Sequence, residues 1–391
     1  MYPIVRPGVS TLVFPAKPPA LAVDVLSGTR PCTSNNTLCH LTTSVPFSGR
    51  FLTHECQDIM EKRSPNTTSI LFCGTDFSAF EDYTREYVQD LPFIKVDDVP
   101  FVDVPSVIKN YDICVPKNMR LNSEIISQAK RLKLILQFGV GLEGIDISAA
   151  TKHGIKVARI PSGVTGNADS CAEMAIFLML GLLRKQNEMQ IAVKQKILGE
   201  PVGDTLMGKT VLIMGFGRIG ISLAKRLRPF GVKIIATKRS WGLDTKNEEE
   251  NDLVVDVKGS HEDIYNFAGQ ADIVVCCLQM NTETAAVINE AFISSMKKGA
   301  FLVNIARGGL LNYQAVFHHL KSGHLGGLGM DVAWTEPFDP DDDILKFPNV
   351  IITPHVAGLT EPSCRYTAKV VGDVALQLHS GKPLKGIEVV N

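Results

Sequence analysis

A glycine-rich turn between a strand-like and a helix-like segment constrains this chain more than any other feature. Thr210–Met214 is a continuous apolar run of strand type, and Ile221–Phe230 has the apolar spacing of a helix. In such a unit Gly215 permits a tight turn, Gly217 lets a ligand approach the backbone, and Gly220 lets the helix pack on the strand. The free N–H groups at the helix start can bind an anion, so the turn predicts a dinucleotide pyrophosphate site. The full turn reads Gly215-Phe216-Gly217-Arg218-Ile219-Gly220.

The end of the next predicted strand, Val232–Ala236, indicates which dinucleotide binds. Proteins that prefer NAD usually place Asp or Glu there, where the carboxylate accepts from the adenosine ribose and repels a 2′-phosphate. This chain has Lys238, Arg239 and Ser240 instead. Two cations and a hydroxyl suit a 2′-phosphate, so the sequence favours NADP(H), with NAD(H) as the alternative. In that alternative, the two cations form a solvated strand end and Arg239 stacks on the adenine of either cofactor.

Composition bounds the class of protein. A chain of 391 residues with 45% hydrophobic content predicts two globular domains. The net charge is −1 and basic residues are scattered, so we expect neither nucleic acid nor a membrane surface as a partner. The nine cysteines are widely spaced and form no Cys-x-x-Cys pair, which predicts a reducing compartment and no structural metal. The longest apolar run, Cys171–Leu183, is too short to span a bilayer and predicts a buried helix.

Alternating strand and helix patterns predict an α/β fold with two doubly wound parallel-sheet domains. We expect a flavodoxin-like substrate domain over 69–165, completed by 359–391, and a Rossmann dinucleotide-binding domain over 166–358. Helices are predicted at 122–131, 167–185 and 367–378, the last returning to the first domain. Strands are predicted at 69–73, 93–96, 113–115, 133–137 and 156–158 in the first domain, and at 211–214, 233–236, 273–276, 301–304, 328–332 and 350–353 in the second.

Residues 1–68 differ in composition from the rest of the chain. Ser, Thr and Pro are abundant there, and before His54 four Lys or Arg residues accompany a single acid, Asp24. A basic, hydroxyl-rich and acid-poor segment is typical of an organelle transit peptide, which would place the protein in a plastid or mitochondrion. The alternative is a disordered extension on a cytoplasmic protein.

From about residue 69 to its end, the chain resembles the D-isomer-specific 2-hydroxyacid dehydrogenases, and most closely a plant branch related to glyoxylate/hydroxypyruvate reductases or phosphoglycerate dehydrogenases. The segments that carry this resemblance keep the family's order and spacing, which makes them specific together. They are Gly139 to Asp146, Asn167 to Glu173, Gly215 to Gly220, Asn304 to Gly309, Gly329 to Val332 followed by Glu336-Pro337, and Thr353 to Gly358.

The resemblance implies an oxidoreductase that transfers a hydride between NADP(H) and a small 2-oxo or D-2-hydroxy acid. His355 would be the acid/base, because imidazole titrates near neutrality, and Glu336 would bond its other nitrogen and fix the tautomer. Arg307 would clamp the substrate carboxylate. The family also implies substrate contacts from Val140 and Gly141. Its remaining implications are that Asp331 accepts from the nicotinamide carboxamide and that the protein is a homodimer.

Two alternatives to a glyoxylate or hydroxypyruvate reductase remain open. The first is a D-3-phosphoglycerate dehydrogenase, which we expect less because the chain ends at Asn391 without the length of a C-terminal regulatory domain. The second is a non-catalytic dinucleotide-sensing corepressor or scaffold, since fold alone does not settle function. Such proteins usually carry a further interaction surface or a long C-terminal tail. Formate dehydrogenases are set aside, because they carry Gln where Glu336 stands.

Overall fold

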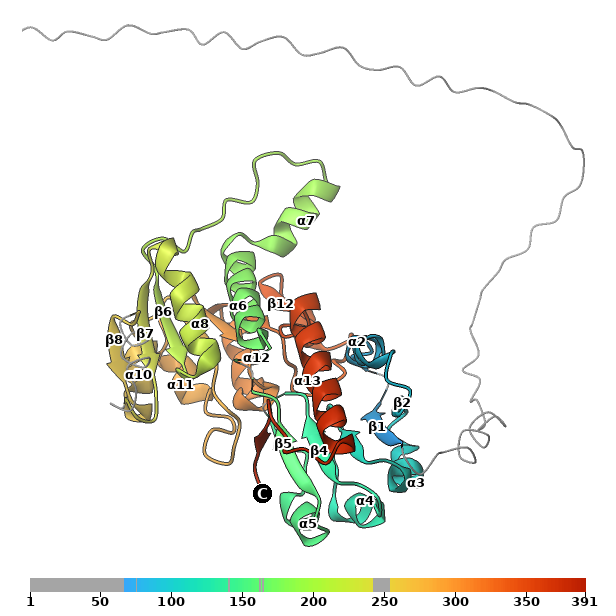
Figure 1. Cartoon of the computed structure of the whole chain (residues 1–391). Helices are drawn as coiled ribbons and strands as arrows, with labels where there is room; N and C mark the ends of the chain where they lie inside the picture. The colour runs from blue at the N-terminus through green and yellow to red at the C-terminus, as the bar shows by residue number, and fades with distance from the viewer. Residues whose placement is uncertain (1–66, 75, 140, 162, 164, 242–253) are drawn as a thin grey trace, which may run out of the picture. The chain divides into compact units, whose positions relative to one another are not determined.

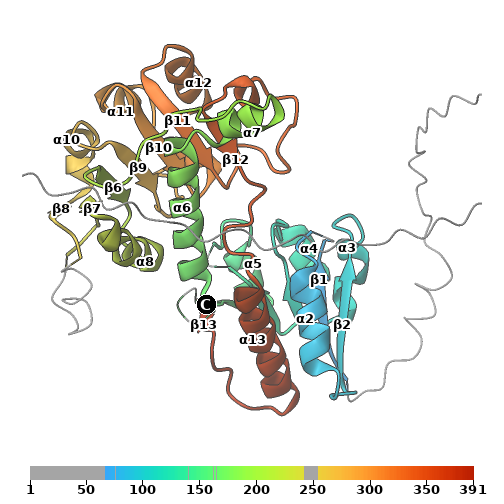
Figure 2. The same ribbon diagram turned by 90° about the horizontal axis from the view of Figure 1, so that it is seen from above.

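Two β-sheets that follow one another along the chain form the framework of the computed structural model. The model describes residues 67–391, except 75, 140, 162, 164 and 242–253. These residues belong to one unit, Arg63–Asn391. Both sheets carry helices on both faces, as Figures 1 and 2 show, which confirms the predicted α/β class.

The first sheet has the strand order β13-β5-β4-β3-β1-β2. Five neighbouring strands are parallel, in the order expected of a flavodoxin-like sheet, and β13 joins β5 in the antiparallel sense. The sequence did not predict β13, which has only two residues. The strands are β1 (Thr68–Cys73), β2 (Ile94–Val99), β3 (Ile113–Val115), β4 (Leu134–Gln137), β5 (Lys156–Arg159) and β13 (Glu388–Val389).

Successive residues of β1 pack on opposite faces of this sheet, as the strand period requires. Ile70 and Phe72 pack with α2 and α13, whereas Leu71 and Cys73 pack with α3, α4 and α5. The final helix thus returns to the first sheet, as predicted, and lies beside α2 in both views (Figures 1 and 2). The helices are α2 (Ala79–Val88), α3 (Val104–Val107), α4 (Ser123–Gln128), α5 (Ile147–Lys152) and α13 (Glu361–His379).

The second sheet has the order β12-β11-β10-β9-β6-β7-β8, with every pair parallel. The six predicted strands are present, and a seventh strand that we did not predict, β8, lies at the edge of the sheet. The strands are β6 (Thr210–Met214), β7 (Lys233–Thr237), β8 (Val257–Gly259), β9 (Ile273–Cys276), β10 (Ala300–Asn304), β11 (Leu325–Met330) and β12 (Val350–Ile352).

Helices cover the second sheet on both faces, which explains why its central strands are apolar throughout. Helices α6 and α8 pack on one face, and α10, α11 and α12 on the other. No described helix is long and apolar enough to cross a membrane. The helices are α6 (Asn167–Leu183), α7 (Gln186–Lys194), α8 (Arg218–Leu227), α10 (Ile264–Ala268), α11 (Glu290–Ser295) and α12 (Tyr313–Lys321). Short 3₁₀ turns occur at 108–110, 228–230, 261–263, 308–310 and 343–346.

Candidate functional site

The candidate functional residues follow the carboxyl ends of parallel strands in the second sheet. Gly215 comes directly after β6, Arg307 after β10, Asp331 after β11 and His355 after β12. Because these strands run parallel in one sheet, their carboxyl ends lie on the same side of it, which is where ligands bind in such sheets. The fold therefore gathers residues that lie up to 140 positions apart in the chain.

His355 and Glu336 form a hydrogen-bonded pair. The Nδ1 atom of His355 lies 2.8 Å from Oε2 of Glu336. A carboxylate can only accept, so Nδ1 carries the proton and Nε2 is left for a substrate. Burial acts to raise the pKa of Glu336, but the hydrogen bond and charge of His355, with the charge of Arg307, hold that pKa below its ordinary value. Glu336 therefore stays ionised near neutral pH.

The backbone at His355 is strained, and Asp331 holds it. His355 has a φ of +57°, an uncommon conformation for a residue with a side chain. The Asp331 carboxylate is 1% exposed and accepts from the N–H groups of Val356 (2.9 Å) and Ala357 (2.8 Å) and the Thr353 hydroxyl (2.5 Å). Burial raises the pKa of Asp331 against these lowering bonds. In the structure Asp331 fixes the histidine loop; its contact with a nicotinamide stays a prediction.

Arg307 stands on a loop shaped by close packing. The buried Asn304 side chain accepts from Ala306 N (3.0 Å) and donates to the Arg307 carbonyl (2.9 Å). A Cβ at Gly308 would collide with the Ala333 carbonyl, so only glycine lets the two loops approach. The Arg307 guanidinium donates through Nη1 to the Ala306 carbonyl (2.7 Å) and is partly buried. The cation is thus fixed at the edge that carries His355.

Two loops of the first sheet contact these residues. A Cβ at Gly141, after β4, would lie 2.5 Å from Nη2 of Arg307 and would also collide with the Glu143 carboxylate. Phe77, after β1, presents its ring edge-on to that of His355, with centroids 6.0 Å apart. Val140, the other predicted substrate contact, lies outside the described residues. Gly141 is therefore brought to Arg307, and Phe77 is brought to His355.

The glycine turn has the geometry that its sequence predicts. Gly215 has a φ of +96°, and a Cβ there would lie 2.8 Å from the Cys277 carbonyl. A Cβ at Gly220 would collide with the Gly215 carbonyl, so α8 packs tightly on β6. A Cβ at Gly217 would meet nothing within 4 Å, which leaves open space beside the first turn of α8. Arg218 and Ile219 form that turn, and N–H groups in the first turn of a helix can bind an anion.

The predicted 2′-phosphate position lies at the end of β7. Arg239 is 87% exposed and its Nη2 lies 3.7 Å from Oε2 of Glu283, while Ser240 is exposed beside it. The Lys238 ammonium lies 5.8 Å from the centroid of the Trp241 ring, and the Lys258 ammonium lies 5.2 Å from it. The indole donates to the Gly259 carbonyl (2.8 Å), which fixes the ring. The sequence did not suggest Lys258, because it belongs to the unpredicted strand β8.

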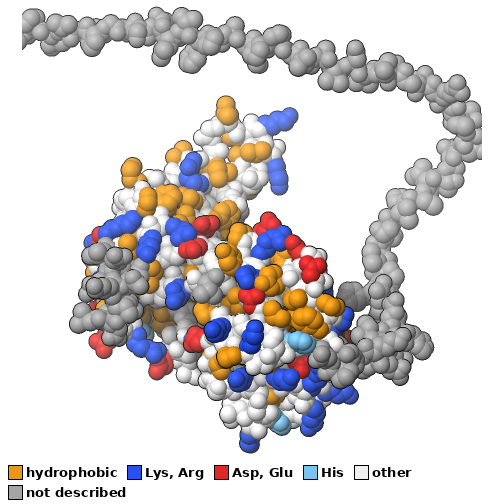
Figure 3. Space-filling model, in the orientation of Figure 1, with side chains coloured by type: hydrophobic (Ala, Val, Ile, Leu, Met, Phe, Trp, Pro, Cys, Tyr) orange, Lys and Arg blue, Asp and Glu red, His pale blue; other side chains and the backbone are white. Residues whose placement is uncertain are grey.

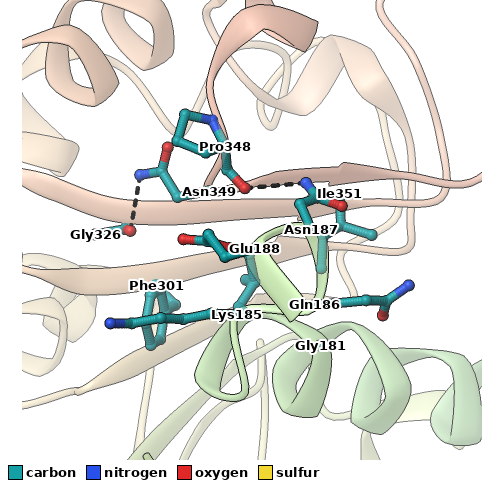
Figure 4. A pocket seen from close by; sticks show the side chains of 11 residues that line it. Gly181, Lys185, Gln186, Asn187, Glu188, Phe301, Gly326, Pro348, Asn349 and Ile351 are labelled. Atoms are coloured by element: carbon teal, nitrogen blue, oxygen red, sulfur yellow. Dashed lines mark hydrogen bonds between the residues drawn. The ribbon is translucent and has the colours of Figure 1, made fainter. Parts of the chain in front are cut away.

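A separate pocket lies at the amino ends of the strands of the second sheet, away from the candidate site. Its volume is about 140 Å³, and its lining includes residues at or beside the starts of β10, β11 and β12, together with the α6–α7 junction. Figure 4 shows Lys185 and Glu188 extending across it, and Asn349 donating to the Gly326 carbonyl (2.8 Å). None of the predicted site residues lines this pocket.

Among the described residues, no group of His, Cys, Asp and Glu is arranged to hold a metal ion. The acidic run 248–250 lies outside the described residues. His319 is 6% exposed, and its Nε2 lies 2.9 Å from Oε1 of Glu290.

Comparison with known proteins places this geometry in a family. The sequence model for the NAD binding domain of D-isomer specific 2-hydroxyacid dehydrogenases matches residues 176–357. A glyoxylate reductase of Thermofilum pendens is 34% identical over 251 residues, which are 62% of this chain and 70% of that protein. The chain belongs to the D-isomer specific 2-hydroxyacid dehydrogenases. The resemblance to this family noted from the sequence is therefore confirmed.

Other members of the dehydrogenase family match over different shares of their length. A D-3-phosphoglycerate dehydrogenase of Archaeoglobus fulgidus is 31% identical over 284 residues, 72% of this chain but 52% of that protein. The chain thus spans about half the length of that relative. A solved glyoxylate reductase from Paecilomyes thermophila is 26% identical, with a TM-score of 0.68, and the match covers 84% of this chain and 98% of that one.

Sequence reasoning missed several residues that shape this dehydrogenase site. Asn304 and Thr353 were inside recognised segments, and their polar side chains at buried strand ends were the available signal. The individual side chains of Phe77 and Trp241 were not singled out from the sequence. Their contacts join segments that lie far apart in the chain.

Proposed function

We propose that this chain is an NADP(H)-preferring reductase of small 2-oxo acids such as glyoxylate or hydroxypyruvate, and that it also oxidises D-2-hydroxy acids. The observation that carries the proposal is the 2.8 Å contact between His355 Nδ1 and Glu336 Oε2, at the sheet edge that also holds Arg307 and the glycine turn. An acid, a cation and an anion-binding turn at one edge are the groups that reduction of a 2-oxo acid requires.

In the proposed reaction, Arg307 binds the substrate carboxylate through two parallel N–H donors and orients the ketone. The reduced nicotinamide supplies a hydride to the carbonyl carbon when it is bound. His355 Nε2 donates its proton to the carbonyl oxygen, so that C=O becomes CH–OH and the ring becomes neutral. Glu336 stabilises the protonated ring before this transfer and keeps the proton on Nδ1 afterwards. Solvent then restores the proton on Nε2.

The dinucleotide fits the residues present. The space beside Gly217 and the first turn of α8 suits a pyrophosphate, and a side chain at Gly217 would fill that space. Lys238, Arg239 and Ser240 would bind a 2′-phosphate, and positions 238–240 contain no acid. Lys258, on the neighbouring strand, adds a further cation near Trp241. These groups support NADP(H) over NAD(H).

The decisive experiment measures loss of reduced-nicotinamide absorbance with the full chain, NADPH or NADH, and glyoxylate, hydroxypyruvate, pyruvate or phosphohydroxypyruvate. We expect turnover that is faster with NADPH and that disappears in His355→Ala. Lys238→Ala is expected to lower the ratio of kcat/KM for NADPH to kcat/KM for NADH about ten-fold, because a charge-assisted bond to phosphate is lost. Tight dinucleotide binding without turnover on any substrate would instead indicate a sensor or scaffold.

A D-3-phosphoglycerate dehydrogenase is the second candidate, and the 31% identity to such an enzyme favours it. Phosphohydroxypyruvate carries a second anionic group, which would need a further cation beyond Arg307. The substrate panel separates the two candidates. If phosphohydroxypyruvate is the best substrate by kcat/KM, the glyoxylate or hydroxypyruvate proposal is wrong.

We further propose that the protein is a homodimer through α6, α7 and the segment that follows. Apolar side chains are exposed there, among them Val193 (73%), Leu198 (98%) and Val202 (81%). Figure 3 shows hydrophobic side chains over α7 on the face drawn. Light scattering should give twice the monomer mass, and Val193→Glu should lower it. A monomeric wild-type protein would contradict this proposal.

We also infer, from composition, that residues 1–68 direct import into a plastid or mitochondrion, as the resemblance to a plant branch suggests. A fusion of these residues to a fluorescent protein should enter one of those organelles in plant cells. Retention of the fusion in the cytoplasm would contradict the inference.

A further inference from the structure

Lys117 is a buried lysine that none of the proposed steps uses. It follows β3, its backbone has a φ of +53°, and its side chain is 0% exposed. Its ammonium donates to the carbonyl of Gly74 (2.9 Å), to the carbonyl of Asp76 and to the carboxylate of Glu81. All three N–H donors of the ammonium are therefore in use.

Two of these acceptors belong to the loop that carries Phe77. The carbonyls of Gly74 and Asp76 lie on the segment between β1 and α2, and Phe77 follows directly. Phe77 has a φ of +59°, so its backbone needs external support. Its ring is the one that lies edge-on to His355. By binding both carbonyls, Lys117 fixes the backbone from which this ring extends.

The carbonyl of Lys117 binds a second loop of the site. It accepts from Nε2 of Gln137 (2.9 Å), the last residue of β4. The chain runs from there through Phe138 to Gly141, which lies against Arg307. The ring of Phe138 also lies 6.1 Å from that of Phe77. One residue thus joins both first-sheet loops that contact the catalytic candidates.

The buried pair of Lys117 and Glu81 is a poor way to stabilise the fold. A buried ion pair must overcome the loss of hydration of both charges, and apolar side chains of similar size often serve equally well. Glu81 is 2% exposed and its Oε2 atom has no partner among the described residues, so the pair is incompletely satisfied. Burial raises the pKa of Glu81 against the lowering effect of Lys117. A geometric role accounts for retaining it.

We propose that Lys117 is a positioning residue, which holds the loops after β1 and β4 so that Phe77 covers His355 and Gly141 meets Arg307. It touches neither substrate nor cofactor in this account. The inference rests on the proposed function for its kinetic consequence, but the effect on the loops does not depend on turnover.

The test compares Lys117→Met/Glu81→Gln, which removes both buried charges, with the wild-type full chain. We expect KM for the 2-oxo acid to rise about ten-fold and kcat to fall, because a small displacement of positioned groups lowers the rate strongly. The dissociation constant for NADPH should not change, since the glycine turn belongs to the other sheet. Amide hydrogen exchange should become faster over 76–79, 138–139 and 141–144, but not over α8.

Two further variants guard against a general loss of folding. Gln137→Met removes one link and keeps the ion pair, so it should give a smaller effect of the same kind even if the double variant does not fold. Arg131→Met is the matched control. Arg131 binds the buried Asp112 (2.8 Å) in the same sheet, but at the amino ends of the strands, away from the loops that contact the catalytic candidates. It should lower the melting temperature without changing KM or loop exchange.

The outcomes separate the two proposals. Folded variants with wild-type kinetics and wild-type loop exchange would overturn the role of Lys117. Faster loop exchange in the variants, together with no turnover in the wild type, would support Lys117 as a positioning residue while the proposed function fails. A rise in KM that Arg131→Met reproduces would also overturn the inference.

Discussion

The loops at the carboxyl ends of the second sheet's strands supply ionisable side chains to the candidate site. The corresponding loops of the first sheet supply an aromatic ring and a glycine. Arg307, Asp331 and His355 follow β10, β11 and β12. From the first sheet, Phe77 lies against His355 and Gly141 lies against Arg307. The comparison indicates that one sheet supplies the groups that could transfer protons and bind the carboxylate, and the other supplies groups that shape the space beside them. Changes in the second sheet should therefore have their largest effect on kcat, and changes in the first should have theirs on KM and substrate preference.

The largest expected effect comes from removing the acid. His355→Gln should lower kcat for reduction about 10³-fold, because proton transfer to the carbonyl oxygen loses its donor. Steady-state kinetics with saturating NADPH measure this, and an unchanged dissociation constant for NADPH is the control. A variant that keeps a tenth of the wild-type kcat would show that another group donates the proton.

Removal of the clamp should have the next largest effect. Arg307→Gln should lower kcat/KM for the 2-oxo acid about 10²-fold, since two charge-assisted bonds to the carboxylate are lost. Arg307→Lys should restore only part of it, because a lysine cannot bind both carboxylate oxygens in one plane. Equal kcat/KM values for wild type and Arg307→Gln would show that Arg307 does not bind the substrate carboxylate.

Replacing Phe77, on a loop of the first sheet, should change the relative kcat/KM values of different substrates without abolishing catalysis. Phe77→Ala should keep kcat for glyoxylate within about three-fold and raise relative kcat/KM for larger 2-oxo acids about ten-fold, since space opens beside His355. A substrate series of increasing side-chain length measures this. If Phe77→Ala lowers kcat as far as His355→Gln does, the division between the two sheets is wrong.

The smallest expected effect is on stability as a function of pH. Because the pKa of Glu336 is lowered in the folded protein, its pairing with His355 stabilises the fold above its unfolded value of 4.5 and stops doing so as pH falls through the folded pKa. At pH 7, Glu336→Gln should lower the melting temperature by about 1–2 °C. The difference should shrink at pH 3.5. A difference that grows on acidification would contradict this assignment.

Prediction from sequence succeeded where the signal is local. The glycine turn, the order of apolar strands and the final helix returning to the first sheet are all found. The final helix begins at Glu361, six residues before the predicted start, because Thr360 caps it and Pro362 suits its first turn. Strand β8 was missed because it has three residues at the sheet edge and too little periodicity to recognise.

By itself, the sequence determined the fold class, the two sheets and the identity of Arg307, Glu336 and His355 as candidates. These depend on periodicity, on glycine positions and on short segments, all of which act between near neighbours in the chain. Only the tertiary structure decided that Asp331 holds the His355 loop, that Phe77 covers His355 and that Lys117 joins two loops. The physical reason is that these contacts join residues 20 to 278 positions apart, and tertiary packing selects which of them meet.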